Sequence, residues 1–155
     1  MTEIERILDQ LKRAYEGNAW HGPSVREALA GVTAAQAHAR PLANTHSIWE
    51  LMQHIAVWES AGRRRLEGDR AAIEISSTED WPPPEDTSEA AWEQAKAALD
   101  RGHEAFREAI ARTPDARLDE PILEGMSTVY VTLHGVIQHD LYHAGQIAML
   151  KKALP

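Results

Sequence analysis

The chain has 155 residues, eight His and no Cys, and its 16 Lys and Arg against 24 Asp and Glu give a formal net charge of −8. The absence of Cys excludes disulfides, thiolate metal sites and a cysteine nucleophile, and the acidic balance argues against general nucleic-acid binding and a polybasic membrane anchor. The length favours one domain, residues 1–155. Because no apolar run approaches the ~20 residues of a membrane span, and the acidic start lacks the basic and apolar parts of a signal peptide, the expectation is a soluble cytoplasmic protein.

The first part of the chain predicts one long and one short helix. Thr2 and Glu5 form a capping-box pattern at the start of the long helix, and Gly17 marks its end. A shorter helix is expected over residues 24–32, and residues 33–45 read as a loop. The long helix presents one apolar face at helical spacing, made of Ile4, Ile7, Leu8, Leu11 and Tyr15.

The second long helix is expected to begin near Ser47, where Ser47 and Glu50 repeat the capping-box pattern. It ends in Arg63–Arg65, just before Gly68, as cations in a last turn and a following Gly favour. Residues 69–86 are acidic and rich in proline, so they predict either a functional lid or a misassigned element. The apolar stripe of this helix consists of Ile48, Leu51, Met52, Ile55 and Trp58.

Two more long helices are predicted, over Ser88–Arg112 and over about Val131–Ala153, joined by a connection at 114–128. Residues 129–132 would suit a strand equally well, because they are rich in β-branched and aromatic side chains. Four long amphipathic helices without a convincing sheet predict an all-α four-helix bundle, with the short extra helix after the first long one. The last helix has a core stripe set by Val136, Ile147 and Leu150.

His139 and His143 lie four residues apart in the last predicted helix. This spacing leaves a rotation of about 40° beyond a full turn, so both rings leave the same face. That face is the core stripe, and buried polar groups without partners are costly. One metal ion satisfies both rings at once; hydrogen bonds to other helices or to water are the alternative.

His54 is the best candidate for a third metal ligand, since it sits on the core stripe of the second long helix. Alone it reads as an ordinary core residue, but three inward His together favour a metal site. His103 stands beside Gly102 and among charged residues, so we expect it in solvent. The remaining histidines are expected to be ordinary residues: His21, His38, His46 and His134.

Three stretches of the chain resemble the DinB superfamily, and the resemblance covers essentially its whole length. They are Thr45-His46-Ser47-Ile48-Trp49-Glu50, His54 with Trp58, and His139-Asp140-Leu141-Tyr142-His143-Ala144-Gly145-Gln146-Ile147. The resemblance implies an up-down-down-up four-helix bundle, often a homodimer. It also implies a divalent metal, nickel or zinc, held by His54, His139 and His143.

Three protein ligands leave a coordination position for water or substrate, which is typical of a catalytic site. Neutral imidazoles leave the metal its full charge, so it can lower the pKa of bound water or bind a thiolate. The two enzyme hypotheses are therefore hydrolysis and thiol transfer on a small-molecule substrate. The resemblance favours transfer, because some relatives use the low-molecular-weight thiols mycothiol or bacillithiol, and a chain without Cys takes its thiol from outside. A non-catalytic dimeric bundle with a structural metal is the alternative.

Five further features are candidate parts of the site. Asp140 resembles the general base of H-E-x-x-H zinc peptidases, but it is interpreted as an acid beyond the metal ligands or on the surface. Gln146 could orient a ligand or link helices. Trp81 predicts a docked lid or a dimer contact. Arg63–Arg65 are interpreted as a solvated helix end in preference to an anion site, and Trp58 as a core residue. Because ligating imidazoles must be neutral, the metal should be lost as the pH falls through about 6.

Overall fold

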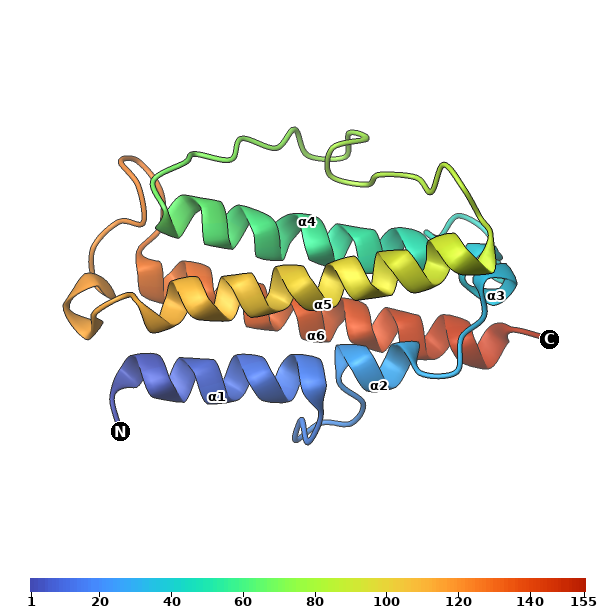
Figure 1. Cartoon of the computed structure of the whole chain (residues 1–155), viewed down its shortest axis with the longest axis horizontal. Coiled ribbons are helices and arrows are strands. Elements are labelled where there is room, and N and C mark those ends of the chain that lie inside the picture. Colours follow the sequence, from blue (N-terminus) through green and yellow to red (C-terminus); the bar gives the residue numbers. More distant parts are fainter.

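The computed structural model describes all residues 1–155 and contains six α-helices and no β-strand. The prediction of an all-α protein is therefore confirmed. Figure 1 shows the four long helices lying side by side, with α4 packed against both α5 and α6. None of the helices combines the length and the apolar character that crossing a membrane requires. The helices are α1 (Glu3–Glu16), α2 (Val25–Leu29), α3 (Ala34–His38), α4 (Ile48–Leu66), α5 (Glu89–Ala111) and α6 (Val129–Ala153).

The long segment 67–88 connects α4 to α5 without helix or strand. It runs back over the length of α4, so α5 begins beside the beginning of α4 (Figure 1). The irregular segment predicted at 69–86 is thus confirmed, and it lies over the bundle as a strap.

Hydrogen-bonded capping boxes start α1, α2 and α4, at Thr2, Ser24 and Ser47. A further box at Thr33 starts α3, so the expected loop over 33–45 was wrong in its first part. Its helix has only five residues, too few to show an apolar periodicity. The strand alternative for 129–132 was also wrong: the side chain of Thr128 accepts from the amide of Val131 and begins α6 there.

The core divides into two apolar clusters, one toward each end of the bundle. One gathers α2, α3 and the first half of α4 around the C-terminal half of α6. The other gathers α1, the last part of α5 and the first half of α6. Between them, the middle of the three longest helices carries buried polar side chains: His54 and Glu59 on α4, His103 on α5, and Asp140 and His143 on α6.

Candidate metal centre

His54, His139 and His143, the histidine trio, converge on one point between α4 and α6. The Nε2 atom of His139 lies 2.9 Å from that of His54 and 3.1 Å from that of His143. All three ligand atoms lie within 4.8 Å of one another. A tetrahedral ion bound at roughly 2.0–2.1 Å per nitrogen separates its ligand atoms by about 3.3 Å. Two of the three separations are therefore close to those between ligand atoms on one face of a coordination tetrahedron.

The outer nitrogens of two trio rings are held by acceptors. Nδ1 of His54 lies 2.7 Å from the carbonyl oxygen of Asp80 and 3.0 Å from its Oδ1. Nδ1 of His143 lies 2.6 Å from Oε1 of Gln146. Since oxygen accepts, both rings carry their proton on Nδ1 and donate it outward. Their Nε2 lone pairs consequently point inward.

Hydrogen bonding alone cannot satisfy these inward lone pairs. A neutral His139 has one N–H, which can serve the lone pair of His54 or that of His143 but not both. Its Nδ1 is itself buried without a partner. A cation at the common point accepts lone pairs from all three rings, and imidazole nitrogen suits several divalent transition metals. The residues present therefore fit a divalent metal ion.

Burial keeps the trio in the neutral form that ligation requires. It lowers the pKa of His139 to about 3, with further lowering from the neighbouring rings of His143 and His54. Burial also lowers the pKa values of His54 and His143 below the usual range of histidine. At neutral pH the site thus presents three uncharged rings, the charge state that ligation requires.

The strap 67–88 fixes the orientation of His54 through Asp80 and Trp81. The Asp80 carboxylate accepts from the amide of Ser76 at 2.8 Å and from Nε1 of Trp58 at 2.8 Å. Although burial opposes it, these bonds hold the pKa of Asp80 below its usual range. A carboxylate behind a ligating histidine fixes the ring and strengthens it as a ligand.

Trp81 lies flat on the same ring. Its ring stacks on His54 at 3.7 Å between centroids and, with its other face, on His46 at 3.6 Å. Of the two predictions for Trp81, the structure thus shows the docked lid. The ring of Trp58 makes T-shaped contacts with His54 and His139 and is only partly buried, so it adjoins the trio and is not a fully buried core residue.

The sequence did not predict Asp80 as part of the site, and it left the role of Gln146 open. Asp80 lies 26 residues after His54, in a segment without periodicity, so no spacing pattern linked the two. Gln146 did carry a signal, because it follows His143 by three residues and so shares its helix face.

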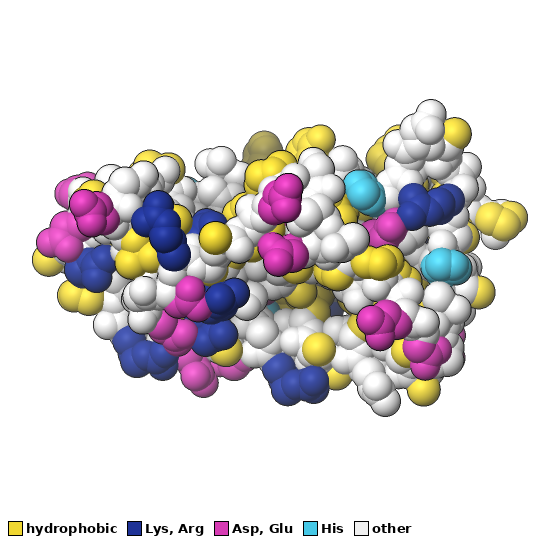
Figure 2. Space-filling model, turned by 90° about the horizontal axis from the view of Figure 1, so that it is seen from above, with side chains coloured by type: hydrophobic (Ala, Val, Ile, Leu, Met, Phe, Trp, Pro, Cys, Tyr) yellow, Lys and Arg dark blue, Asp and Glu magenta, His cyan; other side chains and the backbone are white.

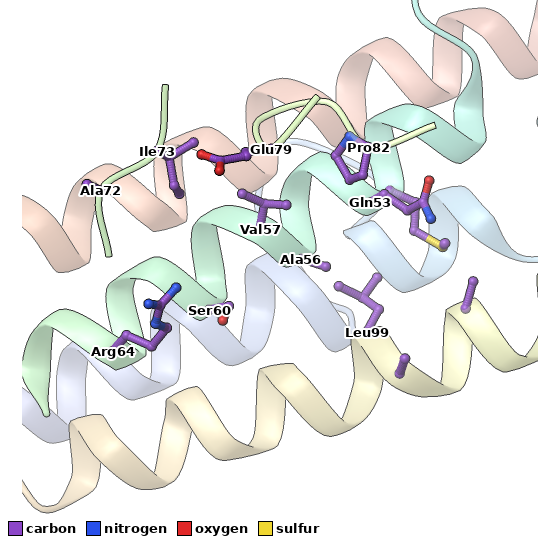
Figure 3. A pocket seen from close by; sticks show the side chains of 13 residues that line it. Gln53, Ala56, Val57, Ser60, Arg64, Ala72, Ile73, Glu79, Pro82 and Leu99 are labelled. Atoms are coloured by element: carbon purple, nitrogen blue, oxygen red, sulfur yellow. The ribbon is translucent and has the colours of Figure 1, made fainter. Parts of the chain in front are cut away.

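Two cavities flank α4. One, of about 560 Å³, borders the trio, with His143, Gln146 and Trp81 in its wall. The other, of about 630 Å³, lies on a different face of α4 and includes no trio residue. In Figure 3 the strap residues Ile73 and Glu79 face Ser60 and Arg64 of α4 across this second cavity.

His103 and Asp140 are not where the sequence placed them. His103, expected in solvent, is 2% exposed, and its Nδ1 lies 2.8 Å from Oε1 of Glu59. Asp140 is completely buried and its two carboxyl oxygens have no hydrogen-bond partner; burial, and after it the nearby carboxyl group of Glu59, raises its pKa well above the usual value. Three buried polar side chains thus lie close together between the helices, and we call them the carboxylate cluster: Glu59, His103 and Asp140.

The arginines at the end of α4 are engaged at the surface, as expected for a solvated helix end. Arg63 pairs with Glu67 at 2.6 Å, and Arg64 pairs with Asp69 at 2.7 Å. Arg65 lies over the ring of Trp58. On the face shown in Figure 2, basic and acidic side chains are interspersed. Nothing on this face gathers positive charge for an anionic cofactor.

One comparison with known proteins gives a match. A family model described as the DinB superfamily matches residues 19–147, a range that includes all three histidines of the trio. No curated protein and no solved structure matches the chain. Since the family model covers most of the chain, the chain belongs to the DinB superfamily.

Proposed function

We propose that this DinB protein binds a divalent metal through His54, His139 and His143 and uses it to transfer a low-molecular-weight thiol to or from a small molecule. The observation that carries the metal site is the pair of inward Nε2 lone pairs that one proton cannot satisfy. Nickel and zinc are the ions that the family resemblance favours. Three protein ligands leave room for an exogenous group, the pattern of a catalytic site.

The chain's own residues have separate tasks in this proposal. Asp80 and Gln146 accept the outer protons of His54 and His143 and so keep their inner nitrogens free to ligate. Trp81 covers the ring of His54 and shields it from water. When bound, the metal supplies a positive charge that stabilises a thiolate. The thiol itself comes from outside, because the chain has no Cys.

The position of Asp140 favours thiol transfer over peptidase-like hydrolysis. In H-E-x-x-H enzymes the acid after the first histidine acts as general base at the metal. Here Asp140 occupies that place in the sequence, but its carboxyl group is completely buried and faces Glu59. A hydrolase reading therefore has no free carboxylate of this kind, since Asp80 is engaged by Ser76, Trp58 and His54.

The first test is elemental analysis of protein purified without a His-tag and reconstituted with nickel or zinc. We expect about one metal equivalent per chain; less than about a tenth would overturn the metal site. The second test is conjugation of a panel of low-molecular-weight thiols to an electrophile, beside a panel of esters. Thiol-dependent turnover that disappears in His54→Ala supports transfer. Ester turnover alone supports hydrolysis, and a large melting shift on chelation without turnover supports a structural metal.

The finer arrangement of the bundle also belongs to this proposal. The up-down-down-up order of DinB proteins is supported by the strap, which returns the chain along α4 before α5 begins (Figure 1). A homodimer is the expected assembly, and size-exclusion chromatography with light scattering tests it directly.

A further inference from the structure

The cavity beside the trio carries information about the substrate. Its volume of about 560 Å³ falls within the usual range for small-molecule sites of roughly 300–1,000 Å³. His143 and its partner Gln146 both contribute to its wall, so a molecule in the cavity lies against a trio residue. Trp81, stacked on His54, contributes a second link to the trio.

No Lys, Arg, Asp or Glu lines this cavity. The cation near its edge, Arg40, is turned away: its guanidinium contacts both carboxylate oxygens of Glu50 at 2.7 Å and the carbonyl oxygen of Thr45 at 2.6 Å. The polar lining that remains comes from Asn44, Thr45 and Gln146 and from the rings of His46 and His143. A charged substrate group would thus lose water in this cavity without gaining a partner of opposite charge.

Large apolar side chains gather at the same cavity. Tyr142 is 66% exposed, Met149 63% and Leu42 43%, and all three line it. Leu51 and Leu150 add buried apolar wall behind them. Exposed apolar groups that converge on one hollow favour burial of an apolar ligand, and the flexible Met149 side chain can adapt to its shape.

We propose that the metal site acts on neutral organic molecules whose apolar, aromatic or aliphatic body occupies the cavity formed by Leu42, Tyr142 and Met149 beside His143. This inference rests on the proposed function for the reaction and adds the substrate class. Anionic and cationic substrates are disfavoured by the lining. In this proposal Leu42 and Met149 set the preference. They contact the body of the substrate and are not metal ligands.

The test uses the full chain loaded with cobalt(II), whose absorption reports a bound thiolate. The probes are phenylmethanethiol, which is neutral and apolar beyond its thiol, and 3-mercaptopropionate, which carries a carboxylate. We expect phenylmethanethiol to bind at least about tenfold more tightly, since burying its ring removes apolar surface from water. In Met149→Lys the preference should shrink by about tenfold or reverse. Ile75→Lys, which changes an exposed apolar residue outside the cavity, should leave it unchanged.

A metal-free arm separates the two proposals. Phenylmethanol should quench the Trp fluorescence of the metal-free protein, and Met149→Lys should weaken this effect while His54→Ala preserves it. Loss of cobalt binding with phenylmethanol binding intact would overturn the metal site and support the cavity. Cobalt binding with equal affinity for both thiols, or with a preference that Met149→Lys does not change, would overturn the substrate class. Protection of Met149 from oxidation that appears only when the protein dimerises at high concentration would also overturn the substrate class, because a second copy would then cover the cavity.

Discussion

The histidine trio and the carboxylate cluster draw on the same two helices. α4 supplies His54 to one and Glu59 to the other, and α6 supplies the adjacent residues His139 and Asp140. Both groups are buried between the two apolar clusters of the core. The two groups differ in how their buried polar atoms can be neutralised or paired.

Protons account for that difference. Burial raises the pKa of Glu59 to about 8 and raises the pKa of Asp140 well above its usual value, so the carboxyl pair holds at least one proton at neutral pH. The pair therefore avoids two buried negative charges side by side, and His103 donates to Glu59. Burial lowers the pKa values of the trio, which has too few protons for its lone pairs. Protons neutralise the charge of the carboxylate cluster, whereas the inward lone pairs of the trio fit a cation.

The strongest test of this contrast removes one trio ring. His143→Ala should abolish metal binding, because two imidazoles seldom retain an ion that three hold. Elemental analysis after reconstitution should find less than about a tenth of an equivalent. His46→Ala is the matched control: His46 also stacks on Trp81 but offers no nitrogen to the trio, so its metal content should stay near that of the wild type. Full metal occupancy in His143→Ala would show that the trio is not the metal site.

The next test weakens the support of a trio ring without removing it. Asp80→Asn keeps the shape and the backbone carbonyl that holds His54 but removes the negative charge behind the ring. Loss of such a partner typically costs about 10–100-fold in metal affinity, and we expect the lower end because the carbonyl remains. Competition with a chelator measures the change.

The neighbouring change Glu79→Gln provides the comparison for Asp80→Asn. Glu79 is exposed on the same strap and does not contact the trio, so its metal affinity should match the wild type. Equal affinities in the two variants would show that the Asp80 charge does not support the site.

The carboxylate cluster predicts a pH dependence of its own. Between about pH 4.5 and 8 the folded, metal-free protein keeps a proton on Glu59 that the unfolded chain releases, so its stability falls as the pH rises. From pH 6.5 to 8 this amounts to about 2 kcal/mol of unfolding free energy. Urea unfolding at the two pH values should show this loss in the wild type and a smaller one in Glu59→Gln.

Glu93→Gln, an exposed change on α5, controls for a general effect of removing a carboxylate and should keep the wild-type pH dependence. If Glu59→Gln loses as much stability as the wild type between the two pH values, Glu59 is ionised in the folded protein and the contrast with the trio fails.

The two clusters differ in how well the sequence predicts them, because sequence patterns relate only residues that lie a few positions apart. His139 and His143 share a helix face by their spacing, and His54 lies on a core stripe, so local periodicity was enough to bring the three into the bundle. The capping boxes at Thr2 and Ser47 likewise depend on residues three apart, and both helices begin there. Patterns of this kind involve residues close together in one helix, so they can be recognised without knowing how the helices pack.

The carboxylate cluster has no such pattern. His103 stands beside a glycine and among charged residues, and nothing in its helix indicates that Glu59, 44 residues earlier, faces it across the bundle. Asp80 poses the same problem, since its partner lies across an irregular segment. Contacts between elements are set by packing, and a single sequence does not state which polar residue meets which. Asp140 is an example: its spacing from His139 and His143 resembles that of a catalytic acid, but its position beside Glu59 could not be predicted from that spacing.

The smallest predicted effect concerns the pH at which the metal is lost. Free histidine would begin to compete with the metal near pH 6.5, but burial lowers the pKa values of the trio, so protons compete only at lower pH. We therefore expect occupancy to persist below pH 6 and to be lost at a lower pH than the sequence suggested. Trp81→Ala should reverse part of this shift, because it uncovers His54 to water and raises its pKa toward the usual value. Ile75→Ala, on the exposed part of the same strap, should leave the midpoint of metal loss unchanged. Metal content after dialysis across pH 4–7 gives that midpoint for each protein, and identical midpoints in Trp81→Ala and the wild type would show that the tryptophan lid does not control the protonation of the site.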